Sequence, residues 1–150
     1  MTMENGRATD DAQIRTVIDD RATALRAKDV DRFMSHYTPD IMKFDLPPPL
    51  RFSGSDALDG KGLEKWFSSF QGPIGYEMRD LSITAGDDVA FCHGLIRISG
   101  ARTDGARTNV WARETLCLRR IDGVWKVSHE HTSVPFHMDG SFKAAVELEP

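Results

Sequence analysis

The N-terminal part of the chain has apolar positions at helical spacing. Residues 1–9 are polar, and we expect them to form a disordered tail. From Asp10 a periodic pattern begins, and its acidic first turn suits the positive end of a helix dipole. Side chains recurring at three- and four-residue steps predict one face of an amphipathic helix: Ile14, Val17, Ile18, Arg21 and Leu25.

Two shorter helices and a short strand are predicted next. Asp29 is a good N-cap for a second helix, which we expect to run through Tyr37 and to end at the following Thr-Pro-Asp. Residues 41–46 alternate as a short strand does, and the three prolines at 47–49 end it because they cannot donate to a sheet. Residues 60–70 predict a third helix.

The second half of the chain has the pattern of a β-meander. Four runs read as strands, at 76–85, 89–99, 108–121 and 124–134. Short turn sequences separate them, and Asp122-Gly123 is a strong hairpin signal. Strands joined by tight turns are antiparallel. Helices followed by such a meander predict an α+β fold.

The predicted helices are the only elements available to cover the apolar face of this sheet. We therefore expect a cone-shaped α+β roll, with three N-terminal helices over a curved, mostly antiparallel sheet and a pocket between the layers. The 150-residue chain is the size of one domain, so we expect one domain over residues 10–136 and a C-terminal extension over 137–150.

Composition narrows the range of partners. The formal net charge is −4, which gives no electrostatic case for nucleic acid or an anionic membrane. The N-terminus lacks the apolar core of a signal peptide, and no apolar run is long enough to span a membrane. Two cysteines in apolar stretches do not make a disulfide framework. We expect a cytoplasmic protein.

The order of elements resembles the nuclear transport factor 2-like superfamily, which includes SnoaL-like polyketide cyclases and ketosteroid isomerases. The resemblance covers about residues 10–135, and four stretches carry it: 29–40, 43–45, 60–70 and 119–133. It implies a domain with an interior pocket that works without a cofactor. The superfamily includes isomerases, cyclases, dehydratases, hydrolases and binding domains, so the fold alone does not name a reaction.

Asp45 is the first candidate catalytic residue. It matches the position of the general base in ketosteroid isomerases, and its neighbours Phe44 and Leu46 are apolar. We predict that its carboxylate faces the cavity, close to residues 111–113 or 129–131. Burial away from cations would raise its pKa, whereas pairing with Arg113 or a protonated histidine would lower it. Alternatively, Asp45 hydrogen-bonds the loop around the prolines. The first predicted helix contains no tyrosine, so the oxyanion donor of the steroid isomerases is missing and steroid isomerisation is not expected.

The run His129-Glu130-His131 supplies further candidates. Alternate side chains of a strand share a face, so the two histidines point together and Glu130 points oppositely. His129 is a second catalytic candidate, and Glu130 and His131 are candidates for substrate binding. Either face could line the pocket, and a β-bulge would exchange them. Two histidines at this spacing could bind a metal with a third ligand from elsewhere, but we expect no metal.

Other side chains are expected to line the pocket. The longest strand places Trp111 and Arg113 on one face, where Arg113 would hold a substrate anion or form a cross-strand ion pair. The opposite face is mostly apolar, so Glu114 there needs a partner. Aromatic residues of the predicted helices complete the lining: Phe33, Tyr37 and Trp66.

These residues favour a small-molecule enzyme that performs acid–base catalysis, as an isomerase, cyclase or dehydratase, on an apolar carbonyl compound. A non-catalytic ligand-binding or oligomerisation domain of the same fold is the alternative, and a protein-interaction module that presents the open sheet face is a third reading. We expect a small apolar or aromatic ligand. We also expect a homodimer through the outer sheet face, because the late strands carry apolar residues on both faces.

Overall fold

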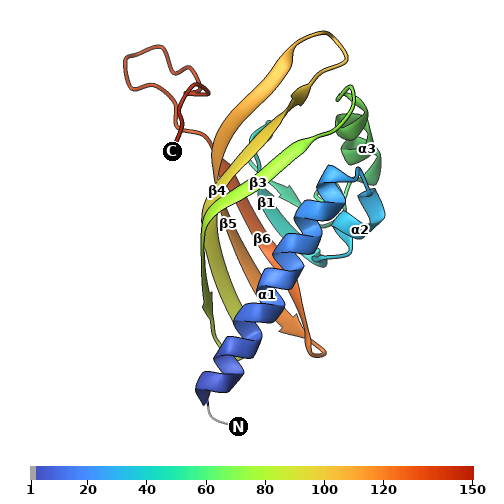
Figure 1. The fold of residues 1–150 in the computed structure, drawn as a ribbon, viewed down its shortest axis with the longest axis vertical. Helices are drawn as coiled ribbons and strands as arrows, with labels where there is room; N and C mark the ends of the chain where they lie inside the picture. The colour runs from blue at the N-terminus through green and yellow to red at the C-terminus, as the bar shows by residue number, and fades with distance from the viewer. Residues whose placement is uncertain (1–2) are drawn as a thin grey trace.

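The structure is a computed structural model that describes residues 3–150 (Figure 1). Three helices and a 3₁₀ turn occupy the N-terminal part: α1 (Met3–Arg26), α2 (Val30–Met34), η1 (Gly54–Asp56) and α3 (Gly60–Ser68). Six strands make up the sheet: β1 (Tyr37–Phe44), β2 (Phe52–Ser53), β3 (Gly75–Ala85), β4 (Val89–Ala101), β5 (Arg107–Ile121) and β6 (Val124–Ser133).

The strands form one sheet in the order β2-β1-β6-β5-β4-β3. All neighbours are antiparallel except β1 and β6, which are parallel. The three helices lie on the same side of the curved sheet, and α1 runs across it (Figure 1). The predicted α+β fold, with N-terminal helices over a mostly antiparallel sheet, is confirmed. Among the described residues, no helix is long and apolar enough to cross a membrane.

The beginning of the chain differs from the prediction in two places. Helix α1 begins at Met3, so residues 3–9 are helical rather than a disordered tail, and residues 1–2 lie outside the described part. The second helix ends at Met34, and Tyr37 begins β1 rather than closing that helix. Pro39 is tolerated inside β1 because it lies where the pairing with β6 shifts register, between Tyr37 and Met42.

A β-bulge in β6 decides which side chains of that strand face the helices. Cys117 of β5 pairs with His129, but the next residue, Leu118, pairs with Val127, so Ser128 is the extra residue. Val127 is buried before the bulge, and Glu130 is buried after it. Glu130 therefore points into the molecule, while the two histidines that flank it point to the outer face of the sheet.

The C-terminal segment after β6 has little regular structure. It folds back once, through a bridge between Phe136 and Ala144, and only Ala145 is buried there. The segment projects beyond the sheet, on the far side of the view from the helices (Figure 1). Several large apolar side chains of this segment are exposed: Phe136, Met138, Phe142, Val146 and Leu148.

Asp20 ties α1 to the connection between α2 and β1. Its carboxylate accepts hydrogen bonds from Arg32 of α2, and it lies 2.6 Å from Nε2 of His36. These bonds from Arg32 and His36 lower the pKa of Asp20 to about 2. The link therefore stabilises the folded chain at pH values above the ordinary range of the carboxyl group, and protonation removes it as the pH falls towards 2.

We expect Asp20→Asn to lower the stability of the protein at neutral pH and to flatten its dependence on pH between about 4 and 2. The variant and the parent should become equally stable near pH 2, where the parent carboxyl is protonated. Urea unfolding at a series of pH values measures this. Asp19→Asn, at an exposed position of the same helix, serves as the control and should leave the profile unchanged; a parallel offset at every pH would contradict the assignment.

Candidate functional site

A cluster of ionisable side chains lies between the helices and the sheet. Arg21 comes from α1, Glu114 from β5 and Glu130 from β6, and all three are almost completely buried. Two buried tyrosines, Tyr37 of β1 and Tyr76 of β3, join them. Charged residues are rarely fully buried without partners. The cluster is therefore the most unusual chemical feature of the interior.

Arg21 is the centre of the cluster. Its Nε donates to the hydroxyl of Tyr37 over 2.7 Å, and one terminal nitrogen donates to Oε1 of Glu114 over 3.2 Å. The other terminal nitrogen donates to Oε1 of Glu130. The guanidinium also lies over the ring of Phe33, 5.0 Å from its centroid. One arginine thus joins two carboxylates from neighbouring strands.

Glu114 is held in place from the β3 side and from β6. The hydroxyl of Tyr76 donates to its Oε1 over 3.3 Å, and the hydroxyl of Thr132 lies 3.5 Å from its Oε2. The sequence pattern left Glu114 on an apolar strand face in need of a partner, and Arg21 is that partner. Both oxygens of Glu114 therefore have hydroxyl or guanidinium partners.

Glu130 differs from Glu114 because one of its oxygens faces an amine. Oε1 accepts from Arg21 and from the hydroxyl of Tyr37, the latter over 3.0 Å. Oε2 lies 3.3 Å from Nζ of Lys43, a residue of β1 that pairs with Glu130 in the parallel ladder. The Lys43 amine also lies 4.7 Å from the centroid of the Tyr37 ring and 5.8 Å from that of Phe33.

Burial changes the acidity of the groups in this cluster. Burial, with help from the Arg21 cation, lowers the pKa of Lys43 to about 8, although the carboxylates of Asp45 and Glu114 act in the opposite direction. Burial also raises the pKa of Tyr37 to about 12, so its hydroxyl stays protonated. Burial disfavours the charged form of Arg21, but the Glu114 carboxylate beside it keeps the pKa of Arg21 well above its ordinary value. Arg21 is a permanent cation, whereas Lys43 exchanges its proton near neutral pH.

This arrangement is suited to moving protons. A carboxylate oxygen next to an amine that titrates near pH 8 provides a base and an acid within hydrogen-bonding range. Arg21 and Tyr37 hold the other oxygen of Glu130 in a fixed position. Lys43 is the most accessible charged member, with 14% of its side chain exposed against 7% for Glu130 and 3% for Arg21.

The predicted placement of Asp45 beneath the helices is wrong. The residue is exposed, and its carboxylate accepts a hydrogen bond from the backbone N–H of Leu46 over 2.7 Å. It follows the last residue of β1, where the chain turns towards the prolines and leaves the sheet. The alternative prediction, that Asp45 hydrogen-bonds the proline loop, describes this position.

The two histidines of β6 lie on the outer face of the sheet, against Phe44. The Phe44 ring is 4.9 Å from that of His129 and 5.4 Å from that of His131. His129 is half-buried and lies 2.8 Å from the carbonyl oxygen of Met42 through Nδ1. Within residues 3–150, no three histidine, cysteine or acidic side chains gather as a metal site would require.

The remaining lining candidates lie apart from the cluster. Trp111 stacks under Arg79, 4.6 Å away, and Arg113 donates to the hydroxyl of Ser133 over 3.1 Å on the outer face. Trp66 packs against the ring of Phe67 in α3 and against that of Phe70, just after the helix. Of the predicted lining residues, the structure brings together Phe33, Tyr37 and Glu130.

Four members of the cluster were missed as site residues: Arg21, Lys43, Tyr76 and Glu114, of which Glu114 was noted only as needing a partner. Arg21 stood among the apolar positions of the first helix, and a charged residue on an otherwise apolar face was the available signal. Lys43 lies two residues before Asp45, and its inward direction depends on the register of β1 with β6. Sequence alternation alone does not give that register.

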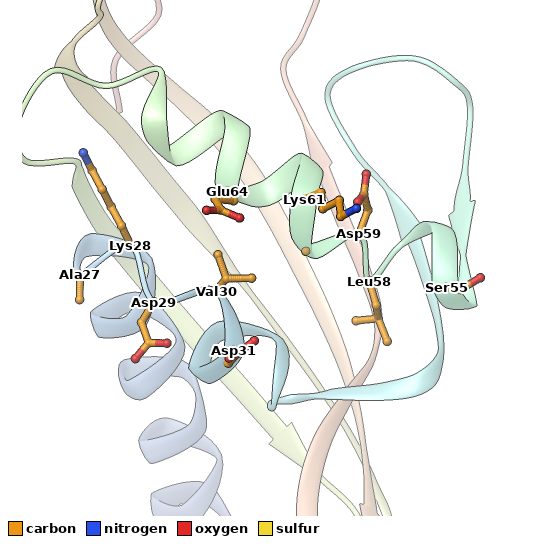
Figure 2. A pocket seen from close by; sticks show the side chains of 11 residues that line it. Ala27, Lys28, Asp29, Val30, Asp31, Ser55, Leu58, Asp59, Lys61 and Glu64 are labelled. Atoms are coloured by element: carbon orange, nitrogen blue, oxygen red, sulfur yellow. The ribbon is translucent and has the colours of Figure 1, made fainter.

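A separate open groove of about 880 Å³ lies where the helices meet. Figure 2 shows it between the end of α1, α2 and the start of α3. Two of its acidic residues are helix caps: Asp29 accepts from the backbone N–H of Arg32, and Asp59 from that of Gly62. These contacts fix the first turns of α2 and α3 at the edge of the groove.

Comparisons with known proteins give a consistent fold. A model of the SnoaL-like domain matches residues 14–137. An NTF2-like protein of unknown function from Pseudomonas putida is 31% identical, with a TM-score of 0.83 over 95% of this chain and 98% of that one. No curated protein sequence matches the chain.

More distant structures share the fold alone. A proposed dehydratase of the NTF2-like family from Streptomyces avermitilis is 17% identical, with a TM-score of 0.74 over 85% of this chain and 97% of that one. A ketosteroid isomerase-like protein from Erwinia carotovora is 22% identical, with a TM-score of 0.67 over 81% of this chain and 93% of that one.

Proposed function

Because this chain belongs to the SnoaL-like domain family, we propose that its interior cluster binds a small carbonyl compound and moves a proton on it without a cofactor. The observation that carries the proposal is the pair formed by Glu130 and Lys43 beside Arg21. Ionisable groups with shifted pKa values gather at functional sites more often than elsewhere. The proposal covers isomerase, cyclase and dehydratase chemistry, which share this proton transfer.

Each member of the cluster has a distinct role in this proposal. Glu130 is the general base that removes a proton from the carbon next to the carbonyl group. Lys43, in its ammonium form, donates to the carbonyl oxygen as negative charge develops there. Arg21 and Tyr37 are positioning residues, since they hold Glu130 through its other oxygen. The rings of Phe33 and Tyr37 favour an apolar substrate.

A non-catalytic ligand-binding domain is the second candidate. The observation that favours it is the complete pairing of Arg21, whose cation is shared by two carboxylates. A cluster with balanced charge can serve as the polar floor of a binding site without taking part in a reaction. In that case a ligand would bind, but proton transfer on it would be no faster than in buffer.

Hydrogen–deuterium exchange of a simple ketone tests the catalytic proposal. We expect the protein to accelerate exchange of the α-protons of 2-tetralone in D₂O, followed by NMR, and Glu130→Gln to reduce the acceleration by about 100-fold or more. Asp45→Asn tests the other candidate for the general base. If this variant loses exchange while Glu130→Gln keeps it, the base is Asp45 and not Glu130. Glu64→Gln, on the separate groove, is the control for unrelated loss of charge. Binding without exchange would favour the second candidate.

We also propose that two copies associate through the outer sheet face. Phe91 is 49% exposed and Phe44 is 38% exposed on that face, and association would remove these rings from water. We expect light scattering at micromolar concentration to give twice the 16.8 kDa chain mass. Phe91→Lys should shift the protein to the monomer, whereas Val146→Lys, in the C-terminal segment, should not. A parent protein that stays at the mass of one chain would contradict the proposal.

A further inference from the structure

Lys43 stands in surroundings that favour a reactive amine. Its Nζ lies between the Glu130 carboxylate and the face of the Tyr37 ring, inside the layer between helices and sheet. Most lysine side chains extend into water, where the ammonium form is strongly hydrated. Burial removes much of that hydration here, and Arg21 already supplies a permanent positive charge to both carboxylates. The two carboxylates therefore keep a positively charged partner even when Lys43 is neutral.

We propose that Lys43 is a covalent site that condenses with aldehydes and unhindered ketones to form an imine. This deepens the proposed function, since it rests on entry of a carbonyl compound into the same cluster. The neutral amine of Lys43 attacks the carbonyl carbon, and the C=O π bond breaks as the C–N bond forms. A proton then passes from the nitrogen to the oxygen to give the carbinolamine. Loss of one water molecule leaves the neutral imine, and uptake of one proton from water gives the protonated imine, so no oxidant or reductant is consumed.

Glu130 is placed to move the protons that this condensation needs. Its Oε2 is the oxygen near Nζ, so it can accept a proton from the nitrogen of the carbinolamine and return it to the departing hydroxyl. Its Oε1 is held by Arg21 and Tyr37 and keeps the carboxylate in place. A protonated imine also withdraws electrons from the neighbouring carbon. The covalent step would therefore make the α-proton easier for Glu130 to remove.

The charges around Lys43 agree with a neutral fraction at physiological pH. Arg21 from α1 opposes the ammonium form, while Asp45 just after β1, Glu114 of β5 and Glu130 of β6 favour it. Burial is the largest effect and brings the pKa of Lys43 to about 8. At pH 7 about a tenth of such an amine is neutral, against well below 1% for a lysine with an ordinary pKa.

Reductive trapping tests the site directly. The protein is incubated with benzaldehyde and sodium cyanoborohydride at pH 7, and peptide mapping by mass spectrometry locates the benzylated lysines. We expect Lys43 to react about tenfold faster or more than the chain's other five lysines. Its rate should level off above about pH 8, whereas the rates of exposed lysines should continue to rise.

Two variants make the result specific. Lys43→Arg keeps a cation beside Glu130 and should remove the fast adduct, leaving only slow labelling elsewhere. Lys126→Arg is the matched control, since Lys126 is also half-buried and donates to the carbonyl oxygen of Ser35, and it should leave the fast adduct unchanged. Labelling of Lys43 at the rate of Lys126 or slower in the parent protein would overturn the inference.

The trapping and exchange experiments separate the two proposals. If exchange of 2-tetralone depends on Glu130 while Lys43 is not trapped, the covalent inference fails and the acid–base proposal stands. If Lys43 is trapped selectively but exchange is not accelerated, the amine site stands and the proposed acid–base function fails. Because trapping is read on the unmodified parent protein, a variant that fails to fold does not affect the result.

Discussion

Replacing Arg21 by methionine is expected to lower the free energy of unfolding by about 3–5 kcal/mol. The substitution leaves Glu114 and Glu130 buried with no guanidinium between them. Of the two carboxylates, Lys43 forms an ion pair with Glu130, so Glu114 is left without an ion-pair partner. Removing one partner of a buried ion pair is strongly destabilising because the remaining charge has lost both water and its counter-charge. Urea unfolding at pH 7 measures the effect.

The same substitution at the surface provides the control. Arg15 pairs with Asp11 one turn away on α1, and both side chains are largely exposed. We expect Arg15→Met to change stability by less than about 0.5 kcal/mol. A loss below about 1 kcal/mol for Arg21→Met at pH 7 would show that the cluster adapts without Arg21.

Trp125→Ala is expected to destabilise the protein by about 3–5 kcal/mol through a different cause. Trp125 lies near the start of β6 and is 2% exposed. The guanidinium of Arg120 lies 4.9 Å from the centre of its ring. Removing the indole takes away a large buried apolar surface and leaves a cavity that the sheet cannot close. Urea unfolding at pH 7 measures this loss.

Trp125→Phe separates the ring from its N–H group. The indole nitrogen of Trp125 is buried and has no hydrogen-bond partner among the described residues. Phenylalanine keeps an aromatic ring and removes that unpaired donor, so we expect a loss of no more than about 1.5 kcal/mol. A phenylalanine variant as unstable as the alanine variant would contradict this, because it would mean that the site needs the full size of the indole and not only an aromatic ring.

The fold could be predicted from the sequence because its signals are local. Four alternating strands and the Asp122-Gly123 turn determine most of the sheet through short-range geometry. The start of β1 could not be predicted in this way. Tyr37 and Thr38 are buried where they meet a strand about 90 residues later, and the pattern around Pro39 resembles a helix end when that strand is not considered.

The candidate site depended on two such distant relations. Glu130 was a candidate, but the choice between it and His129 turned on a bulge at Ser128, and a bulge leaves no clear mark in the sequence. Arg21 was noticed only as a member of a helical face, because its partners come from strands far along the chain. Asp45 was placed in the cavity on the basis of the resemblance. In the structure β1 ends one residue before it, and its side chain lies outside the core.

The parallel pairing of β1 with β6 affects when the protein can fold during its synthesis, because the two strands leave the ribosome at different times. Arg21 and Lys43 leave the ribosome early, whereas Glu114 and Glu130 lie in the last two strands. Until those strands emerge, the inward-facing cations have no counter-charge, and the strand that carries Lys43 has no partner on its β6 edge. Burying these unpaired charges would cost free energy, so the nascent N-terminal half is not expected to form its core at that stage. Synthesis of β5 and β6 delivers both the missing strand and the missing negative charge, so the core is expected to close only after these two strands have emerged.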